Sequence, residues 1–264
     1  MGHDKLRKFA ENESFDCLLQ PSAAELLADG FFDLRDHAVK GRWNETMFDA
    51  ARPVVLELGC GKGEYTIDLS RRIPSRNYIG VDIKGARLWK GAKYAHENAL
   101  GNVAFLRTRI EFITAFFAPD EVSQIWLTFS DPQLKSENSR LTSPVFLERY
   151  RKFLKPGGVV HLKTDSRFLY EYSLAVARRN GLRILAATAD LYGVPRSELA
   201  VDEVNALYEV QTFYERMFRA QGYKICYLSF TLDHEGPFEY PDFDAAYWRS
   251  VEGPRHFATP PEKV

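Results

Sequence analysis

The chain has 264 residues, of which 45% are hydrophobic and 14% aromatic, and its formal net charge is −1. This length is typical of one large domain or of one domain with extensions, and the hydrophobic fraction is sufficient for a sizeable core. The near-zero net charge argues mildly against a wholly basic nucleic-acid-binding protein.

The sequence carries no pattern of export, membrane insertion or metal binding. No apolar run approaches the roughly 18 residues of a membrane span, and the start Met1-Gly2-His3-Asp4-Lys5 lacks a signal-peptide pattern. The three cysteines, Cys17, Cys60 and Cys226, match no disulfide or metal-ligand spacing. We therefore expect a cytoplasmic protein with no membrane or metal site.

Residues 1–52 are expected to form an N-terminal arm and packing segment. The first 20 residues are polar and mixed in charge, with a basic start at Lys5-Leu6-Arg7-Lys8-Phe9 that could contact phosphates. Aromatic residues follow that we expect to pack against the main domain, namely Phe31, Phe32, Trp43 and Phe48.

From Pro53 onward, strand and helix patterns alternate, which predicts βαβ units and a parallel sheet over residues 53–232. The expected strands are residues 53–58, 77–82, 102–107, 123–129, 157–163, 182–188 and 223–230. The expected helices are residues 63–73, 84–98, 143–154 and 166–180. Residues 190–221 are polar with helical character, and residues 233–264 are expected to form an irregular C-terminal tail.

The first strand of this series leads into a glycine-rich turn with the pattern E-x-G-x-G-x-G. Glu57 is followed by Gly59, Gly61 and Gly63. Because glycine has no Cβ, the backbone can turn sharply and approach a ligand closely. The dinucleotide fingerprint is G-x-G-x-x-G, so this tighter loop suits a ligand without phosphates. A plain glycine turn between strand and helix is the alternative.

A second acid, Asp82, ends the next strand about 20 residues further along the chain. An acid at this place can accept hydrogen bonds from both hydroxyls of a ribose. The two strand ends together predict a nucleoside cofactor site.

The helix expected next carries basic residues at intervals of three and four, namely Lys84, Arg87, Lys90 and Lys93. This spacing places them on one face of the helix. The face either contacts phosphates or is an ordinary solvated surface, and the pattern suits both.

Later strands also end in polar residues, and sites in open α/β sheets lie at the carboxyl ends of strands. Asp131 and Asp165 are therefore candidates. Asp131 is followed by a proline and also suits a simple turn, while Asp165 precedes a helix that it could cap. The segment Thr212-Phe213-Tyr214-Glu215 combines a hydroxyl, two aromatics and an acid, and also suits an ordinary amphipathic helix start.

Together these clusters resemble the bacterial tRNA (guanine-N7)-methyltransferase family, usually called TrmB. The resemblance lies in Leu56 to Gly63, Gly80-Val81-Asp82, Phe129-Ser130-Asp131-Pro132, Leu162-Lys163-Thr164-Asp165 and Thr212 to Glu215. It implies an α/β fold with a doubly wound, Rossmann-like class I methyltransferase sheet, mostly parallel with an antiparallel final strand. It also implies S-adenosyl-L-methionine (SAM) as methyl donor and tRNA as partner, with guanine 46 of the variable loop as target. No obligate protein partner is implied.

The resemblance also implies roles for single residues. Those assigned to SAM are Glu57, Gly59, Gly61, Gly63, Asp82, Arg109 and Asp131, with Asp131 also catalytic. Those assigned to the tRNA guanosine are Lys135, Asp165, Thr212, Phe213, Tyr214 and Glu215. Gln133 stands where the family commonly has tryptophan, and Arg109 stands where it often has Asp or Asn beside the adenine.

Methylation at N7 requires no strong general base, because that nitrogen has a free lone pair at neutral pH. Positioning and carboxylates near the migrating positive charge would supply the catalysis. Three alternatives stay open. An exocyclic-amine methyltransferase would need a second proline and an aromatic where Gln133-Leu134 stand, and a small-molecule methyltransferase would not need Lys135. A non-catalytic RNA-binding subunit would not need the complete glycine motif.

Overall fold

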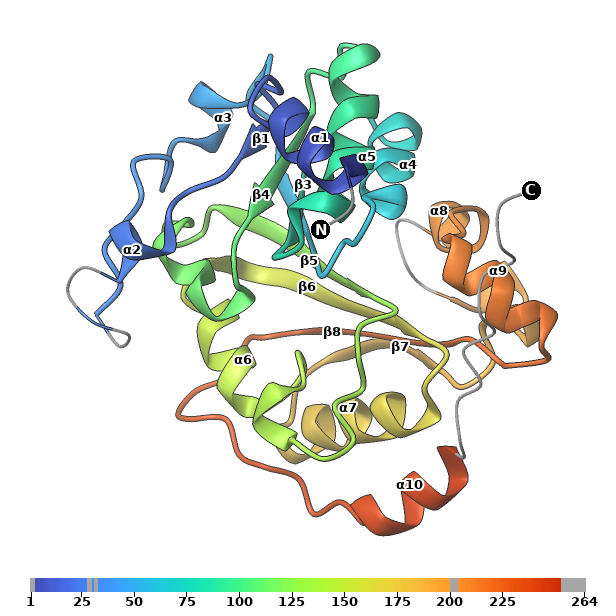
Figure 1. Ribbon diagram of the computed structural model, residues 1–264. Helices are drawn as coiled ribbons and strands as arrows, with labels where there is room; N and C mark the ends of the chain where they lie inside the picture. The colour runs from blue at the N-terminus through green and yellow to red at the C-terminus, as the bar shows by residue number, and fades with distance from the viewer. Residues whose placement is uncertain (1–2, 28–29, 31–32, 200–203, 253–264) are drawn as a thin grey trace.

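The computed structural model describes residues 3–27, 30, 33–199 and 204–252, and within them the chain folds around one mixed sheet. The sheet has eight strands in the order β1-β4-β3-β2-β5-β6-β8-β7. Only β8 runs antiparallel to its neighbours, β6 and β7. Figure 1 shows helices on both sides of this sheet. The predicted doubly wound fold with an antiparallel final strand is confirmed.

The strands are β1 Leu18–Leu19, β2 Val54–Leu58, β3 Asn77–Asp82, β4 Val103–Arg107, β5 Val122–Thr128, β6 Leu154–Thr164, β7 Ile184–Thr188 and β8 Cys226–Thr231. The helices are α1 His3–Asn12, α2 Ala23–Leu26, α3 Trp43–Thr46, α4 Glu64–Arg72, α5 Gly85–Glu97, α6 Pro144–Tyr150, α7 Arg167–Arg179, α8 Val204–Glu209, α9 Phe213–Ala220 and α10 Ala245–Glu252. The 3-10 turns are η1 Ile110–Ala115, η2 Glu137–Ser139, η3 Leu191–Gly193 and η4 Arg196–Glu198.

Both faces of the central strands are buried, which explains their nearly continuous apolar sequences. Successive residues of β2 illustrate this, because Leu56 joins the core under α6 and α7 whereas Val55 joins the core under α4 and α8. The carboxyl ends of these buried strands are thereby held in one row, where a site can be built.

Phe105 of β4 explains the third glycine of the turn. A Cβ at Gly63 would lie 2.5 Å from the Phe105 ring, and one at Gly80 or Gly91 would lie within 2.7 Å of it. The ring fills the space that the three missing side chains leave. Gly63 therefore serves the packing of α4 against the sheet, whereas the sequence pattern assigns it to ligand approach.

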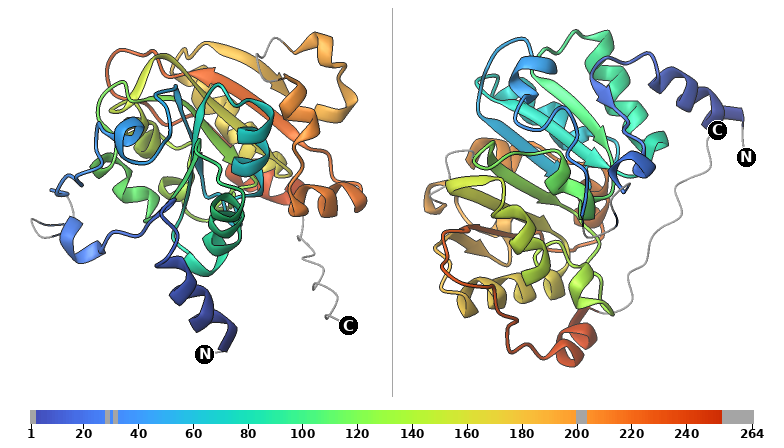
Figure 2. Two further views of the ribbon diagram at one scale, coloured as in Figure 1. Left: turned by 90° about the horizontal axis from the view of Figure 1, so that it is seen from above. Right: turned by 90° about the vertical axis from the view of Figure 1, so that its left-hand side faces the viewer.

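The N-terminal segment is more regular than the sequence predicts. Its first residues form α1, which lies against α5 (Figures 1 and 2), and β1 adds an edge strand parallel to β4. Trp43 is fully buried and stacks on Phe117 with 5.2 Å between ring centroids. Phe48 packs against the same core, whereas Phe31 and Phe32 lie outside the described residues.

The C-terminal strap, residues 233–252, is also more regular than expected. It was predicted to be irregular throughout, but residues 245–252 form α10, which lies beside α7 at the end of the molecule opposite α1 (Figures 1 and 2). Residues 190–221 form η3, η4, α8 and α9 with the described residues between them. Among the described residues, no helix is long and apolar enough to cross a membrane.

Candidate active site

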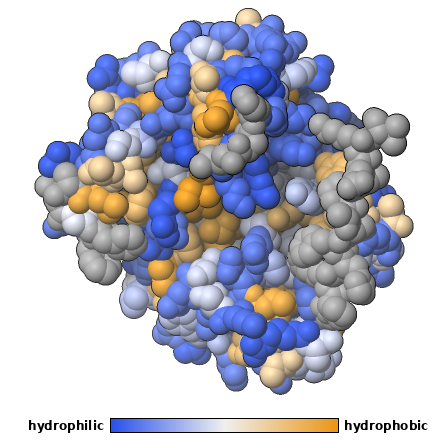
Figure 3. Space-filling view, in the orientation of Figure 1, coloured by the Kyte–Doolittle hydropathy of each residue, from blue (hydrophilic) through white to orange (hydrophobic). Residues whose placement is uncertain are grey.

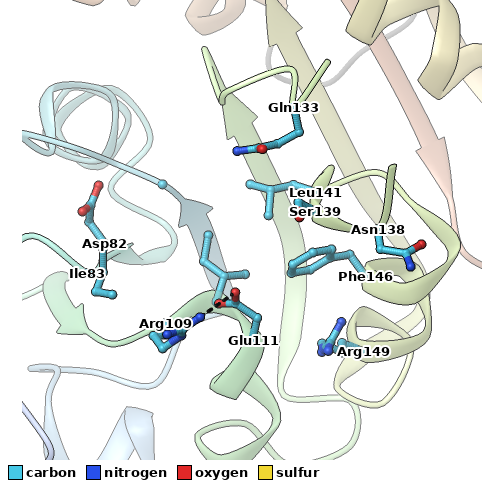
Figure 4. A pocket seen from close by; sticks show the side chains of 12 residues that line it. Asp82, Ile83, Arg109, Glu111, Gln133, Asn138, Ser139, Leu141, Phe146 and Arg149 are labelled. Atoms are coloured by element: carbon cyan, nitrogen blue, oxygen red, sulfur yellow. Dashed lines mark hydrogen bonds and ion pairs between the residues drawn. The ribbon is translucent and has the colours of Figure 1, made fainter. Parts of the chain in front are cut away.

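Two cavities lie at the carboxyl ends of the parallel strands, and both are lined by Gly59. The large cavity has a volume of about 470 Å³ and is lined by residues that include Asp82, Ile83, Arg109, Glu111, Phe146 and Arg149 (Figure 4). The small cavity has a volume of about 90 Å³ and is lined by residues that include Glu57, Gly61, Arg87, Thr128, Thr212 and Phe213. In the space-filling view, hydrophobic surface is visible in the hollow near the middle of the same face (Figure 3).

The glycine turn joins the two cavities. Gly59 and Gly61 have φ values of 81° and 59°, a region that favours glycine. A Cβ built on either residue would meet no atom within 4 Å. These two glycines therefore leave open space beside the backbone, as expected for a ligand-contacting loop.

Asp82 holds the turn in place from the end of β3. Its Oδ2 accepts a hydrogen bond from the Gly61 amide at 3.0 Å, and its Oδ1 accepts one from the Lys84 amide at 2.8 Å. Each carboxylate oxygen has two lone pairs, so each can also accept from a ribose hydroxyl. Asp82 lines the large cavity, as its predicted role requires.

Glu57 is buried beneath the small cavity. Its Oε1 accepts from the Thr128 hydroxyl at 2.5 Å, and its Oε2 accepts from the Thr66 amide at 2.8 Å and from the Thr66 hydroxyl. Burial raises the pKa of Glu57 to about 7, although these hydrogen bonds oppose the shift. Sequence reasoning found Glu57 but missed both threonines, which have no spacing signal of their own.

Asp131 lies on the loop that follows β5, and residues on either side of it in the sequence line the two cavities. Phe129 lines the small cavity and Gln133 lines the large one. Asp131 itself is exposed and lines neither, and its Oδ1 accepts from the Gln133 amide at 2.9 Å. The turn expected from the Asp-Pro pair is thus present.

The same loop is fixed to the body of the protein by Arg140. Its guanidinium packs over the rings of Phe168 and Tyr172, at 4.7 and 4.3 Å from their centroids. Its Nε also donates to the Gln133 carbonyl at 3.3 Å. Lys135 on this loop is exposed and lines neither cavity.

Asp165 directly follows β6 and is 8% exposed. It is not the cap of the helix that follows, because the Ser166 hydroxyl caps α7 by accepting from the Leu169 amide at 3.0 Å. The capping alternative for Asp165 is therefore wrong. Asp165 lines neither cavity, and its predicted substrate role stays a proposal.

The segment from residue 212 to 215 divides into two parts. Thr212, Phe213 and Tyr214 line the small cavity, and the two aromatic side chains are 43% and 42% exposed. Thr212 also caps α9 by accepting from the Glu215 amide at 3.1 Å. The helix-start alternative and the predicted location at a cavity are thus both realised.

Glu215 departs from its predicted substrate contact, because it is fully buried. Its Oε1 lies 2.9 Å from the Lys163 Nζ and accepts from the Tyr192 hydroxyl at 2.5 Å. Lys163 is also fully buried and donates to the carbonyls of Leu207 and Val210. Burial lowers the pKa of Lys163 to about 8, while the neighbouring Glu215 opposes the shift. The helical pattern around Glu215 could not reveal that this acid faces inward to a lysine on β6.

The predicted basic surfaces are largely neutralised by nearby acids. On α5, Lys90 lies 3.0 Å from Glu64, and Lys93 lies 3.5 Å from Glu11. On α1, Asp4 forms ion pairs with both Arg7 and Lys8. Arg87 differs, because it lines the small cavity. The solvated-surface alternative therefore describes Lys90 and Lys93.

Several cavity residues carry no motif that sequence reasoning could have used. Ile83 and Phe146 present apolar surface, and Glu111 and Arg149 present charge. Arg109 lines the large cavity with its side chain, and its guanidinium lies 3.3 Å from the Glu111 carboxylate. Within the residues that the structure describes, no group of three or more His, Cys, Asp or Glu side chains could hold a metal ion.

Comparisons with known proteins agree with this geometry. A family model described as "Putative methyltransferase" matches residues 51–228. A tRNA (guanine-N(7)-)-methyltransferase from Christiangramia forsetii is 48% identical over 231 residues, which cover 87% of this chain and 98% of that protein. One from Bacteroides thetaiotaomicron is 46% identical over 245 residues, or 92% of each chain. The crystal structure of the 16S rRNA methyltransferase KamB has a TM-score of 0.52 over 75% of this chain and 94% of that one, and its 16% identity shows likeness in fold alone.

Proposed function

The chain belongs to the tRNA (guanine-N(7)-)-methyltransferase family, and we propose that it transfers a methyl group from SAM to N7 of guanine 46 in the tRNA variable loop. The observation that carries the proposal is the meeting of two cavities at Gly59, with the Asp131 loop running from one to the other. A methyl donor and an acceptor base must meet end to end, and this arrangement suits that requirement.

The residues present fit SAM. The large cavity lies within the usual size range of cofactor sites, and Asp82 keeps acceptor capacity for the two ribose hydroxyls. Gly59 and Gly61 leave room for a close approach of the ligand to the backbone. SAM supplies a methyl group that is already activated on a positively charged sulfonium.

The acids at the strand ends have an electrostatic task. During transfer the positive charge moves from sulfur to the purine, so carboxylates near this path lower the barrier when they are already in place. Asp131 and Asp165 lie at the ends of neighbouring strands β5 and β6, which supports this role for both. They also suit the N1–H and exocyclic amine of guanine, two donors that adenine does not offer at the same atoms.

The tRNA would be held around these acids. Lys135 is exposed on the loop that carries Asp131 and suits a backbone phosphate, whose negative charge would otherwise be repelled by the acids. Phe213 and Tyr214 expose aromatic surface at the small cavity, which suits stacking on an unpaired base. Glu215 would act from inside, by fixing the start of α9.

The test is methyl transfer from labelled SAM to unmodified tRNA, with the product mapped by borohydride–aniline cleavage at N7-methylguanosine. We expect cleavage in the variable loop, and none when guanine 46 of the tRNA is replaced by adenine. Asp131→Ala is expected to lower the rate by about 100-fold or more while SAM affinity changes less than about threefold. The matched control is Asp16→Ala, because Asp16 is an exposed aspartate of the N-terminal segment.

Two outcomes would contradict the proposal. Labelled product that resists the cleavage would indicate methylation at an exocyclic amine instead of N7. SAM binding without any methylation of tRNA would indicate a small-molecule substrate or a non-catalytic RNA-binding role.

A further inference from the structure

The large cavity contains a second acid that the proposed reaction has not used. If the ribose of SAM binds at Asp82, the glycine turn directs one end of the ligand to the small cavity and leaves the large cavity for the base. Four apolar side chains line that space and suit the faces of a purine, namely Ile83, Ile110, Leu141 and Phe146. The edge of the base then needs polar partners.

Glu111 is placed to serve that edge. Figure 4 shows its carboxylate and the Arg109 guanidinium pointing toward each other, with Ile83 and Phe146 on opposite sides of the pair. The two groups are 3.3 Å apart, and the Glu111 side chain is 36% exposed. This carboxylate is therefore oriented by a neighbour and still accessible from the cavity.

The residues that line the large cavity limit which groups can accept a hydrogen bond from the exocyclic amine of adenine. An exocyclic amine donates hydrogen bonds, whereas arginine has no acceptor, so Arg109 and Arg149 cannot receive it. Among the described lining residues of the large cavity, only Asp82 and Glu111 are carboxylates, which accept hydrogen bonds more strongly than the neutral side-chain oxygens of Gln133, Asn138 and Ser139. The remaining acceptor capacity of Asp82, beside its hydrogen bonds to the Gly61 and Lys84 amides, is assigned to the ribose hydroxyls.

We propose that Glu111 recognises the exocyclic amine of the SAM adenine and that Arg109 is the positioning residue that orients the Glu111 carboxylate. This inference rests on the proposed use of SAM. It assigns the selection of an adenine nucleoside to the start of η1. It also gives the Arg109 side chain a task that does not require it to touch the ligand.

The experiment measures direct binding of two ligands, S-adenosylhomocysteine and its 6-deamino analogue, by calorimetry. The two differ only in the amine, so their affinity ratio reports the contact. We expect wild type to prefer the amine-bearing ligand by about tenfold, the value of one good hydrogen bond to a charged group. Glu111→Ala should reduce this preference to about twofold or less, and Glu111→Gln, which keeps an acceptor oxygen, should be intermediate.

Arg109→Gln tests the positioning role. It should weaken the preference without abolishing it, and the double variant Arg109→Gln/Glu111→Ala should show the same ratio as Glu111→Ala alone. Glu45→Ala is the matched control, because Glu45 forms a comparable exposed ion pair with Arg42 at 3.2 Å. Its affinity ratio should equal that of wild type.

The outcomes separate this inference from the proposed function. A tenfold preference that persists in folded Glu111→Ala protein would overturn the inference. So would equal binding of both ligands by wild type. Failure of wild type to bind S-adenosylhomocysteine at all would instead contradict the proposed function, and the inference with it.

Discussion

Glu57 links the chemistry of the site to the pH dependence of stability. Its pKa is raised from 4.5 to about 7 by burial, so between these values the folded protein holds a proton that the unfolded chain releases. The stability contributed by this group is therefore fully present below pH 4.5 and is lost as the pH rises through 7. The loss is at most about 3 kcal/mol.

Glu57→Gln should remove this dependence, because the amide stays neutral at every pH. In urea unfolding at pH 5.5 and pH 8, we expect the variant to gain stability relative to wild type as the pH rises. Glu235→Gln, at an exposed glutamate, serves as control and should follow the wild-type profile. A constant difference between Glu57→Gln and wild type across this range would contradict the shift in pKa.

The position of a residue at a cavity was predictable at the ends of β2 and β3, where Glu57, Gly59, Gly61 and Asp82 line the cavities. The role of a residue was not predictable where it depends on the direction in which the side chain points. Glu215 carries the same carboxyl group whether it faces a ligand or a buried lysine, and the choice depends on how α9 meets β6. Glu111 shows the opposite case, since no motif marks it and only the folded chain brings it to the cavity.

At the scale of elements, the buried ion pair between Lys163 and Glu215 joins β6 to α9 and thus to the wall of the small cavity. Both side chains are 0% exposed, and the Lys163 Nζ has two further acceptors in the carbonyls of Leu207 and Val210. A buried pair of this kind adds little net stability over an apolar pair, but removal of one partner leaves an uncompensated charge.

We therefore expect Lys163→Met to destabilise the protein by about 3–5 kcal/mol, with a smaller loss for Glu215→Met. The asymmetry follows because Lys163 would keep its two carbonyl acceptors, and its pKa is already lowered to about 8, so it can lose its proton. The double variant should return to within about 1–2 kcal/mol of wild type. Denaturant unfolding checks all three, and additive losses in the double variant would contradict the coupling.

The elements themselves were largely predictable, because β2, β4 and β5 are mostly apolar runs between turn signals. The boundary between α6 and β6 was wrong, because α6 ends at Tyr150 and β6 begins at Leu154, ahead of the proline and glycines that were expected to separate helix from strand. The N-terminal and C-terminal segments were not predictable. β1 has only two residues and depends on pairing with β4, and α10 has no buried residues to give it a periodic pattern. Such elements are stabilised by long-range contacts that the local sequence does not encode.

At the scale of the whole molecule, the C-terminal strap connects the loop that carries Asp131 to α7. The Tyr240 hydroxyl donates to Asn138 at 2.6 Å in the loop that lines the large cavity. Further along, the Phe168 amide at the start of α7 donates to Glu252 at 2.9 Å. The strap therefore bridges the loop with Asp131 and the helix that follows Asp165.

Phe243 is the anchor of this strap, because its ring packs edge-on against Phe168 and Tyr172, with 5.4 Å between centroids in both pairs. Phe243→Ala should cost about 2–3 kcal/mol, which corresponds to a fall in Tm of about 5–10 °C for a chain of this size. It should also raise both the Kd for SAM and the KM for tRNA, because the strap contacts the loop that lines the large cavity and carries Asp131. Tyr247→Ala on the same strap, at a side chain that is 56% exposed, should change Tm by no more than about 1–2 °C. Equal effects of the two variants on Tm would show that the strap is not anchored through Phe243, and unchanged values of both constants would show that the strap does not support the site.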